Sequence, residues 1–453
     1  MATLLHLAVL LFTLGTTVSA PQQEIPQSVI DEIFLSNNDY TDGDQFIPPS
    51  ESTFDSFDWR LCQILHKRDA GNLIVSPISL KLMLAMVYEG ADNQAAEELR
   101  TALGLSEDRL ASRDKYFNIL QSLERKEPNL VLEVASKMFL RNDLTPRSVY
   151  KKILQYIYSA DLEQLDFSKS TQAVRTINSW VRKATHGHIE SMLDDDVVSP
   201  NTMALLLNAI YFKGLWRYPF NPNSTMPGTF QVSPTTNVSA EFMMLAQYLY
   251  FSESVELDSK IIRLPYKGNK YSMFIVLPNK ADGLNHLLEK VTPSLLRQQM
   301  FLMEEVEANL VLPKFKFEFT TELGDVLQEM GIREIFSPST TNLGGIVRGK
   351  SVYVSKVLQK AALEVNEEGT EAYVTTGIVI DHRIGGESVN FYAKHPFMFF
   401  IQDEKNGTVI FVGKLVDPTN SDTPLTNSNP QNTSSKMENN SSGENKIQQD
   451  EKM

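Results

Sequence analysis

Between residues 52 and 418 the sequence shows no linker-like break in composition at which it could divide into two domains. Apolar residues make up 42% of the chain, which is enough to build a substantial core. Helical periodicity dominates the first half of this region, whereas 203–216 and 270–278 read as buried strands. Because helices and strands are mixed and do not alternate strictly, we predict one large α+β domain over 52–418.

The clearest helix begins at Ser76, a favourable N-cap, with Pro77 at the first helical position, and ends at Gly90. Another stretch, 309–319, alternates apolar and polar residues and predicts a single strand. Helical spacing also recurs at 93–105, 113–126, 146–160, 170–185 and 323–332.

The two ends of the chain differ from this region. Residues 1–20 form an uncharged apolar run that ends Val18-Ser19-Ala20, which predicts a cleaved signal peptide and a secreted, extracellular protein. Residues 21–51 carry seven acidic side chains and no Lys or Arg, so we expect a flexible acidic arm. Residues 419–453, rich in Ser, Asn and Thr, predict a disordered tail. No other segment of the sequence is apolar over the length that a membrane span needs. The distribution of charge does not suggest a nucleic-acid-binding surface.

Six N-glycosylation acceptor sequences support secretion, whereas the cysteine content provides no disulfide framework. The single cysteine, Cys62, allows no internal disulfide, and its helical apolar surroundings favour a buried side chain over an intermolecular bridge. Asn406-Gly407 also predicts a hairpin tip between two apolar runs, which would expose Asn406. N-glycosylation acceptor sequences occur at Asn223, Asn237, Asn406, Asn432, Asn439 and Asn440.

No enzyme motif is found. The chain contains no G-x-S-x-G, no H-E-x-x-H and no phosphate-binding loop. His186 and His188 could pair on a metal, but a polar turn explains them better. Basic residues between 107 and 127 could bind a polyanion, although interleaved acids favour a solvated helix face. They are Arg109, Arg113, Lys115, Arg125 and Lys126. We expect no cofactor and no metal.

Several motifs together resemble one family. The segments "NLIVSPISL", "GADNQAAEELR", "INSWVRKATHGHI", "NAIYFKGLWRYPF", "LPKFKFEF" and "HPFMFFI", with "EVNEEGTEA", occur in the order and spacing of the serpins, serine-protease-inhibitor-like proteins. The resemblance covers essentially all of 52–418. It implies three β-sheets, about eight or nine helices and an exposed reactive loop, here 367–390, near the C-terminus.

In serpins a protease cuts this loop, and the cut loop inserts into the main sheet as an extra strand. The segment "EEGTEAYVTTGIVIDHRIGG", 367–386, has the residues that insertion needs. Alternation along a strand would turn Thr370, Ala372, Val374 and Thr376 inward, and all four are small or β-branched. No Pro interrupts the run. The resemblance identifies Glu367, Gly369, Thr370, Glu371 and Ala372 as the hinge.

In this family the reactive bond lies sixteen residues beyond the Glu that opens the hinge, and from Glu367 that count reaches Arg383. Arg383 is also the only Lys or Arg between Lys360 and Lys394. Cleavage is therefore expected at Arg383–Ile384. Because a guanidinium fits a specificity pocket that holds a carboxylate, the expected partner is a trypsin-like serine protease, trapped as an acyl-enzyme.

Other positions follow from the resemblance. Trp216 matches the aromatic residue where the loop enters the sheet, and Ser76, Ser79 and Asn208 match polar residues beneath the centre of the opening sheet. Gln359 stands where the family commonly has His, and its amide can both donate and accept hydrogen bonds. Ordinary core packing is the alternative interpretation for each.

Two functions stay open at this point. The first is a suicide inhibitor in an extracellular proteolytic cascade, such as innate immunity or clotting, acting as a monomer. The second is a non-inhibitory serpin that carries a ligand or acts as a chaperone. The absence of charge and Pro on the inward hinge positions favours the first. Tyr40, among acids in the arm, could be sulfated and dock on a protease exosite, although a solvated leader explains it more simply.

Overall fold

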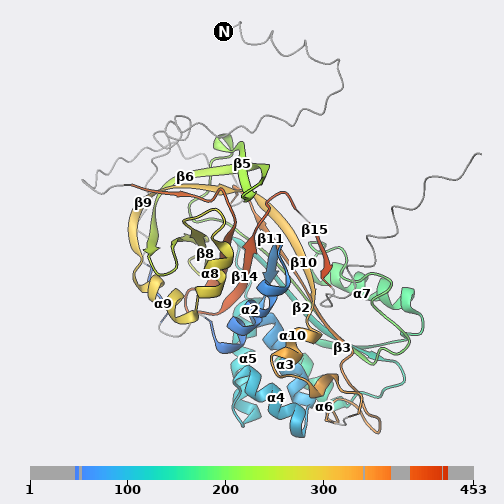
Figure 1. Ribbon diagram of the computed structural model, residues 1–453. Helices are drawn as coiled ribbons and strands as arrows, with labels where there is room; N and C mark the ends of the chain where they lie inside the picture. The colour runs from blue at the N-terminus through green and yellow to red at the C-terminus, as the bar shows by residue number, and fades with distance from the viewer. Residues whose placement is uncertain (1–45, 50–53, 340–341, 369–387, 421, 427–453) are drawn as a thin grey trace, which may run out of the picture.

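The computed structural model describes residues 46–49, 54–339, 342–368, 388–420 and 422–426, with only the backbone of 422–426. Within these ranges the chain forms two large sheets and nine α-helices (Figure 1). Helical content and mixed sheets confirm the predicted α+β class. No helix among the described residues combines the length and the apolar character needed to cross a bilayer.

The first sheet has six strands in the order β15-β10-β11-β4-β2-β3. Their bounds are β15 Asp422–Thr426, β10 Phe315–Glu322, β11 Lys356–Val365, β4 Ala204–Gly214, β2 Leu130–Arg141 and β3 Asp161–Leu165. The pairs β10–β11 and β4–β2 are antiparallel, whereas β11 runs parallel to β4 in the middle of the sheet.

The second sheet has nine strands, and the 19-residue β6, Thr236–Ser254, runs through both of its halves. One half contains β12, β9, β5 and most of β6, and the other contains β7, β8, β13, β14 and β1. The resemblance implies three sheets. Two of them share β6 and so form one continuous hydrogen-bonded sheet, which leaves two sheets among the described residues. The strands are β1 Leu73–Val75, β5 Met226–Ser233, β7 Ser259–Pro265, β8 Tyr271–Pro278, β9 Glu304–Pro313, β12 Val389–Tyr392, β13 Phe397–Asp403 and β14 Val409–Leu415.

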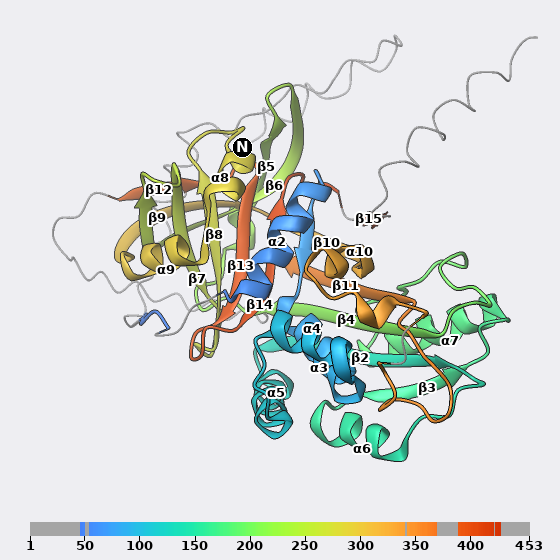
Figure 2. The same cartoon turned by 60° about the horizontal axis from the view of Figure 1, so that its bottom comes forward.

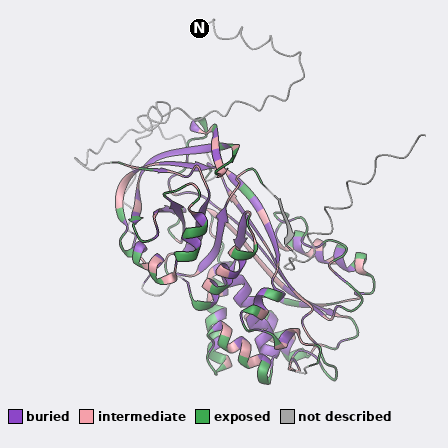
Figure 3. Cartoon of the chain, in the orientation of Figure 1, coloured by how far each residue is buried: buried purple, intermediate pink, exposed green. Residues whose placement is uncertain are grey.

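The helices pack against the sheets as amphipathic layers. In Figure 1 the helices α3 to α6 gather at the lower end of the molecule, and α7 lies beside the six-stranded sheet. Figure 3 shows that exposed residues concentrate on these outer helices while the strands are mostly buried. The helices are α2 Ser56–Arg68, α3 Pro77–Gly90, α4 Asn93–Leu103, α5 Arg109–Glu124, α6 Ser148–Ile157, α7 Ser170–Ala184, α8 Leu284–Lys290, α9 Pro293–Phe301 and α10 Gly324–Glu329.

Local sequence signals explain where several elements begin and end. The Ser76 side chain accepts a hydrogen bond from the backbone of Ser79 at the start of α3, as an N-cap should. Between β13 and β14 the chain turns at Asn406-Gly407, where Gly407 has φ +73°. Both predictions are confirmed. Cys62 is buried, as expected, and burial raises the pKa of its thiol well above the ordinary value.

Three expectations need correction. The alternating stretch 309–319 is not one strand, because β9 ends at Pro313 and β10 starts at Phe315 in a different sheet. Within the predicted tail, 422–426 forms β15. The predicted reactive loop also extends too far, since Val389 and Asn390 pair with Ala308 and Asn309 as part of β12.

Candidate functional site

The junction between β4 and β11 is the candidate site. These strands are neighbours and parallel, with Gln359 directly opposite Asn208. Their outer neighbours, β2 and β10, each pair with them in the antiparallel sense. The chain leaves β11 toward Glu367, so a segment that folded back between β4 and β11 would run antiparallel to both. Such an insertion would replace a parallel junction, the slightly less stable kind, with two antiparallel ones.

A polar network, fully buried except at Ser136, lies on one face of this junction. The Gln359 amide nitrogen donates to the Ser76 carbonyl, the Ser79 hydroxyl and Asn208 Oδ1, each at 3.0 Å. Its Oε1 accepts from the Ser76 backbone N–H at 2.7 Å. Ser79 Oγ also donates to Asn208 Oδ1 at 2.8 Å, and Asn208 Nδ2 donates to Ser136 Oγ on β2 at 3.0 Å.

This network forms because a helix begins beneath a sheet. The first N–H groups of α3 have no intrahelical acceptors, and the Ser76 side chain and Gln359 satisfy two of them. The structure brings together four residues that the sequence analysis singled out: Ser76, Ser79, Asn208 and Gln359. The sequence analysis missed Ser136, whose only signal was a polar residue among apolar ones in a half-buried strand.

The opposite face of the junction is apolar. Residues of β4 alternate, so that Leu206 and Ile210 lie with Asn208 on the α3 side. The residues of β4 that face α7 are Leu205, Leu207, Ala209 and Tyr211. On the α7 side, β4 and β11 share a cluster with this helix and the segment after it. Its members include Leu205, Leu207, Ala209, Tyr211, Leu358, Ala362, Val174, Ile177, Val181, Ile189, Met192 and Leu193. Separating β4 from β11 would therefore also disturb this packing.

Glu367 is fixed where the chain leaves β11. Its Oε1 accepts from the Thr225 hydroxyl at 2.8 Å, its Oε2 lies 3.0 Å from Lys314 Nζ, and its carbonyl accepts from Phe220 N. Burial alone would raise the pKa of Glu367, but the hydrogen bonds and the Lys314 charge outweigh it and lower the pKa. The carboxylate is thus ionised and held at neutral pH.

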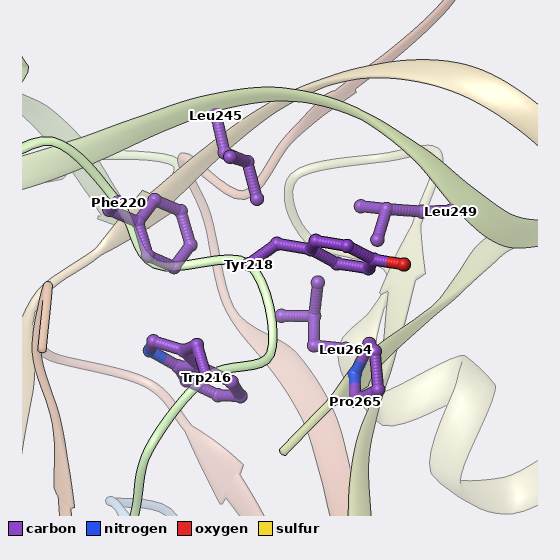
Figure 4. Close-up of a pocket in the computed structure, with 7 residues that line it drawn as sticks. All are labelled: Trp216, Tyr218, Phe220, Leu245, Leu249, Leu264 and Pro265. Atoms are coloured by element: carbon purple, nitrogen blue, oxygen red, sulfur yellow. The ribbon is translucent and has the colours of Figure 1, made fainter. Parts of the chain in front are cut away.

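Trp216 does not belong to the polar network but lies beside Glu367. Its indole N–H donates to the carbonyl of Asn366 at 2.8 Å, and its ring stacks on Tyr266 with centroids 4.4 Å apart. Figure 4 shows Trp216 with Tyr218, Phe220 and Leu245 around a small apolar pocket. The pocket volume is about 10 Å³, room for at most one water molecule.

Only some of the remaining predicted positions lie among the described residues. Gly369, Thr370, Glu371, Ala372, Arg383, Ile384 and Tyr40 lie outside the described residues. Asn223, Asn237 and Asn406 are exposed, as glycan acceptors must be, and Asn432, Asn439 and Asn440 lie outside the described ranges.

The alternative sites considered from the sequence gain little support. His186 lies in a turn with Nδ1 3.0 Å from Glu133, and His188 stacks on Tyr211 with centroids 4.0 Å apart. The described residues contain no group of three potential metal ligands. On α5, Arg109 donates to three backbone carbonyls and Arg113 pairs with Glu89, so both guanidinium groups are engaged within the protein.

Comparisons with known proteins identify the family. The family model for serpins (serine protease inhibitors) matches residues 52–418. This chain belongs to the serpin family. Serine protease inhibitor 42Dd of Drosophila melanogaster is 37% identical over 364 residues, which cover 79% of this chain and 94% of the relative. This serpin is accordingly a protease inhibitor and not an enzyme.

Solved serpin structures share the fold. Serpin48 of Tenebrio molitor, described as highly specific, matches with a TM-score of 0.71 at 30% identity, covering 80% of this chain and 96% of that one. Human thyroxine-binding globulin complexed with its ligand matches with a TM-score of 0.74 at 24% identity, covering 82% and 98%. Both neighbours show that this chain has the serpin fold.

Proposed function

We propose that this serpin is a secreted suicide inhibitor of trypsin-like serine proteases that cleave after Arg383, and that it regulates an extracellular proteolytic cascade. The observation that carries the proposal is the parallel β4–β11 junction, with the polar network on one face and the hinge residue Glu367 at its end. A sheet with this junction closed can accept one more strand. The loop that follows Glu367 has the composition of such a strand.

The reaction has two stages. The protease serine attacks the Arg383 carbonyl, the bond to Ile384 breaks, and the new α-amine of Ile384 takes up a proton and leaves as the start of the C-terminal fragment. The acyl-enzyme then remains attached to the free end of the loop. As about 14 residues insert at ~3.3 Å each, the protease moves on the order of 45 Å. Distortion of its oxyanion hole can slow deacylation by ~10²–10³.

The polar network sets the resistance to this insertion. Gln359 and Asn208 lie opposite each other on the two strands that must separate, and their side-chain hydrogen bond spans the junction. A strand inserted there would satisfy the backbone hydrogen bonds of both strands. The free-energy cost of opening the junction therefore comes from the side-chain network and from the apolar cluster under α7. The closed sheet is then metastable, and the inhibitor acts once.

The first experiment is incubation of the secreted protein, lacking residues 1–20, with trypsin. We expect a band on denaturing gels at the summed mass and a released peptide that begins at Ile384, identified by mass spectrometry. An Arg383→Ala variant should lose both. Cleavage at Arg383–Ile384 without a stable complex would contradict the inhibitor and favour a non-inhibitory serpin, a ligand carrier or chaperone.

A matched pair of variants tests insertion itself. Ala372 and Glu371 are adjacent, and strand alternation would turn Ala372 inward and Glu371 outward. We expect Ala372→Arg to convert the inhibitor into a substrate, because the charge would be buried, whereas Glu371→Arg should still form the complex. Equal inhibition by both variants would rule out insertion with this register.

A further inference from the structure

The segment that follows β14 is held by the buried side chain of Asn72. Asn72, just before β1, accepts hydrogen bonds at Oδ1 from the backbone N–H groups of Val416 and Asp417, at 2.7 and 2.9 Å. Its Nδ2 donates to the carbonyls of Asp417 and Asn420, at 2.7 and 3.2 Å. The Asp417 carboxylate also accepts from the Thr419 N–H and hydroxyl. The turn at 417–420 is therefore specified by side chains.

This turn directs the following residues onto an open sheet edge. Beyond it, β15 pairs in parallel with β10, with Asp422 opposite Glu318 and Thr423 opposite Phe319. In Figure 2 β15 lies to the right of β10. In the sheet order β15 is the outermost strand, so β10 would form the edge without it. An uncovered edge presents a row of backbone donors and acceptors that can pair with another chain.

The β10 edge has little protection of its own. Edge strands often carry unpaired charges that discourage pairing with other chains. The charges of β10 are instead compensated by its inner neighbour. Lys316 Nζ lies 3.5 Å from Glu364, Glu318 lies 2.6 Å from Lys360, and Glu322 lies 3.0 Å from Lys356. The strand that covers this edge, by contrast, contains Pro424, which lacks a backbone donor and suits an outermost strand.

We propose that β10 is a strand-accepting edge, that β15 is its intramolecular occupant, and that the β10 edge of a second copy of this chain takes its place when β15 is removed. The second copy would bind by the same edge, giving an antiparallel pair about a two-fold axis. Tethering through the Asp417–Asn420 turn gives β15 an effective concentration on the order of millimolar, which outcompetes a second copy at micromolar concentration.

The inference is independent of the proposed inhibition. β15 lies on the far side of β10 from the β4–β11 junction, so β15, β10 and β11 can move as one unit when the junction opens. Complex formation with trypsin should therefore proceed with β15 present or absent.

Two truncated proteins test it. One ends at Thr426 and keeps β15, and the other ends at Asn420 and keeps only the turn that Asn72 holds. Both lack the acceptor sequences at Asn432, Asn439 and Asn440, so they differ only in the last six residues. We expect the Thr426 protein to remain a monomer in light scattering at tens of micromolar, ~10⁻⁵ M, where the Asn420 protein doubles its molar mass. The amides of 315–322 should exchange faster in the Asn420 protein at low concentration.

Two further measurements guard against misfolding of the truncated protein. A synthetic peptide of residues 419–426 should return the Asn420 protein to a monomer only on the order of millimolar peptide. In the full-length protein, Thr423→Pro with Leu425→Pro leaves three consecutive residues of β15 without N–H donors and should also cause dimerisation. Monomers throughout, with unchanged exchange in β10, would overturn the proposal, as would equal dimerisation of the Thr426 and Asn420 proteins.

Discussion

The centre of the nine-stranded sheet and the junction of the six-stranded sheet are equally buried but differently built. In the first, Phe274 of β8 stacks on Phe400 of β13 with ring centroids 4.8 Å apart, and both side chains are fully buried. The strands there pair in the antiparallel sense. At the junction, Asn208 and Gln359 are also fully buried, but they meet through hydrogen bonds across a parallel pair.

The difference indicates which sheet can open. Aromatic packing is lost when the strands separate, because nothing of the same shape replaces it. Hydrogen bonds can be exchanged for bonds to water or to an inserted strand, so breaking them costs less. The molecule thus combines a rigid apolar sheet with a sheet whose centre is held by exchangeable bonds.

The largest predicted effect is a loss of stability caused by a substitution in the nine-stranded sheet. Phe400→Ala removes a fully buried aromatic ring and should lower the free energy of unfolding by about 3–5 kcal/mol. Urea unfolding measures it, with Phe301→Ala, whose side chain is largely exposed, as the matched control. At permissive temperature the variant should still trap trypsin. A loss below 1 kcal/mol in Phe400→Ala would contradict the division into rigid and opening sheets.

The second prediction concerns the helices behind the junction. Lys81, on the helix that begins with Ser76, lies 2.7 Å from Asp58 and 2.7 Å from Asp55. Burial raises the pKa of Asp58 from 3.8 to about 6; the Lys81 charge opposes this and nearby Asp55 adds to it. The folded state therefore binds this proton more tightly than the unfolded state. This stabilisation is complete below pH 4 and is lost as the pH rises to 6, a decline of about 3 kcal/mol.

Asp58→Asn should abolish this decline in urea unfolding measured between pH 4 and 7. Asp55→Asn is the comparison: because it removes the charge that adds to the Asp58 shift, the decline should become smaller but persist. Burial raises the pKa of Asp55, but the Lys81 charge and hydrogen bond outweigh it and lower the pKa. The stability from Asp55 is therefore lost only below pH 3.8, outside the window. An unchanged pH profile in Asp58→Asn would show that Asp58 does not titrate there.

The third prediction compares two buried glutamines, one in each sheet. Gln359 makes hydrogen bonds to Ser76, Ser79 and Asn208, whereas the side chain of Gln402 on β13 has no hydrogen-bond partner among the described residues. Gln359→Met leaves buried groups unpaired and should destabilise the closed sheet by about 1–3 kcal/mol. Gln402→Met should not lower stability. Thermal unfolding measures the stability of both variants. Equal losses of stability would contradict the difference between the two sheets.

Several elements of the fold and of the candidate site could be predicted from the sequence. Ser76 and Pro77 predicted the start of α3, whereas Asn208 and Gln359 were assigned to the sheet centre only through the resemblance to serpins. The break between β9 and β10 could not be predicted, because Pro313 and Lys314 do not interrupt the alternating pattern and only the assignment to two sheets separates the strands.

The tail strand β15 escaped prediction for a related reason. Its five residues are mostly polar and include Pro424, with Leu425 as the only aliphatic side chain, so they show no strand pattern of their own. The pairing depends on the open edge of β10 and on the turn held by Asn72, which lies more than 340 residues away in the sequence. Such long-range contacts leave no local signal.

The smallest predicted effect concerns Glu367, the residue at which the proposed hinge begins. Thr225→Val removes the hydroxyl that donates to Glu367 and should cost about 1 kcal/mol at pH 7. Since this bond helps to lower the pKa of Glu367, the loss should vanish in acid, where the carboxylate is protonated. Thr225 also completes the acceptor sequence at Asn223, so Asn223→Gln serves as the baseline and Thr225→Ser, which keeps the hydroxyl and the acceptor sequence, should match the wild type. If Thr225→Val unfolds at the same urea concentration as Asn223→Gln at pH 7, Lys314 and the backbone alone hold Glu367.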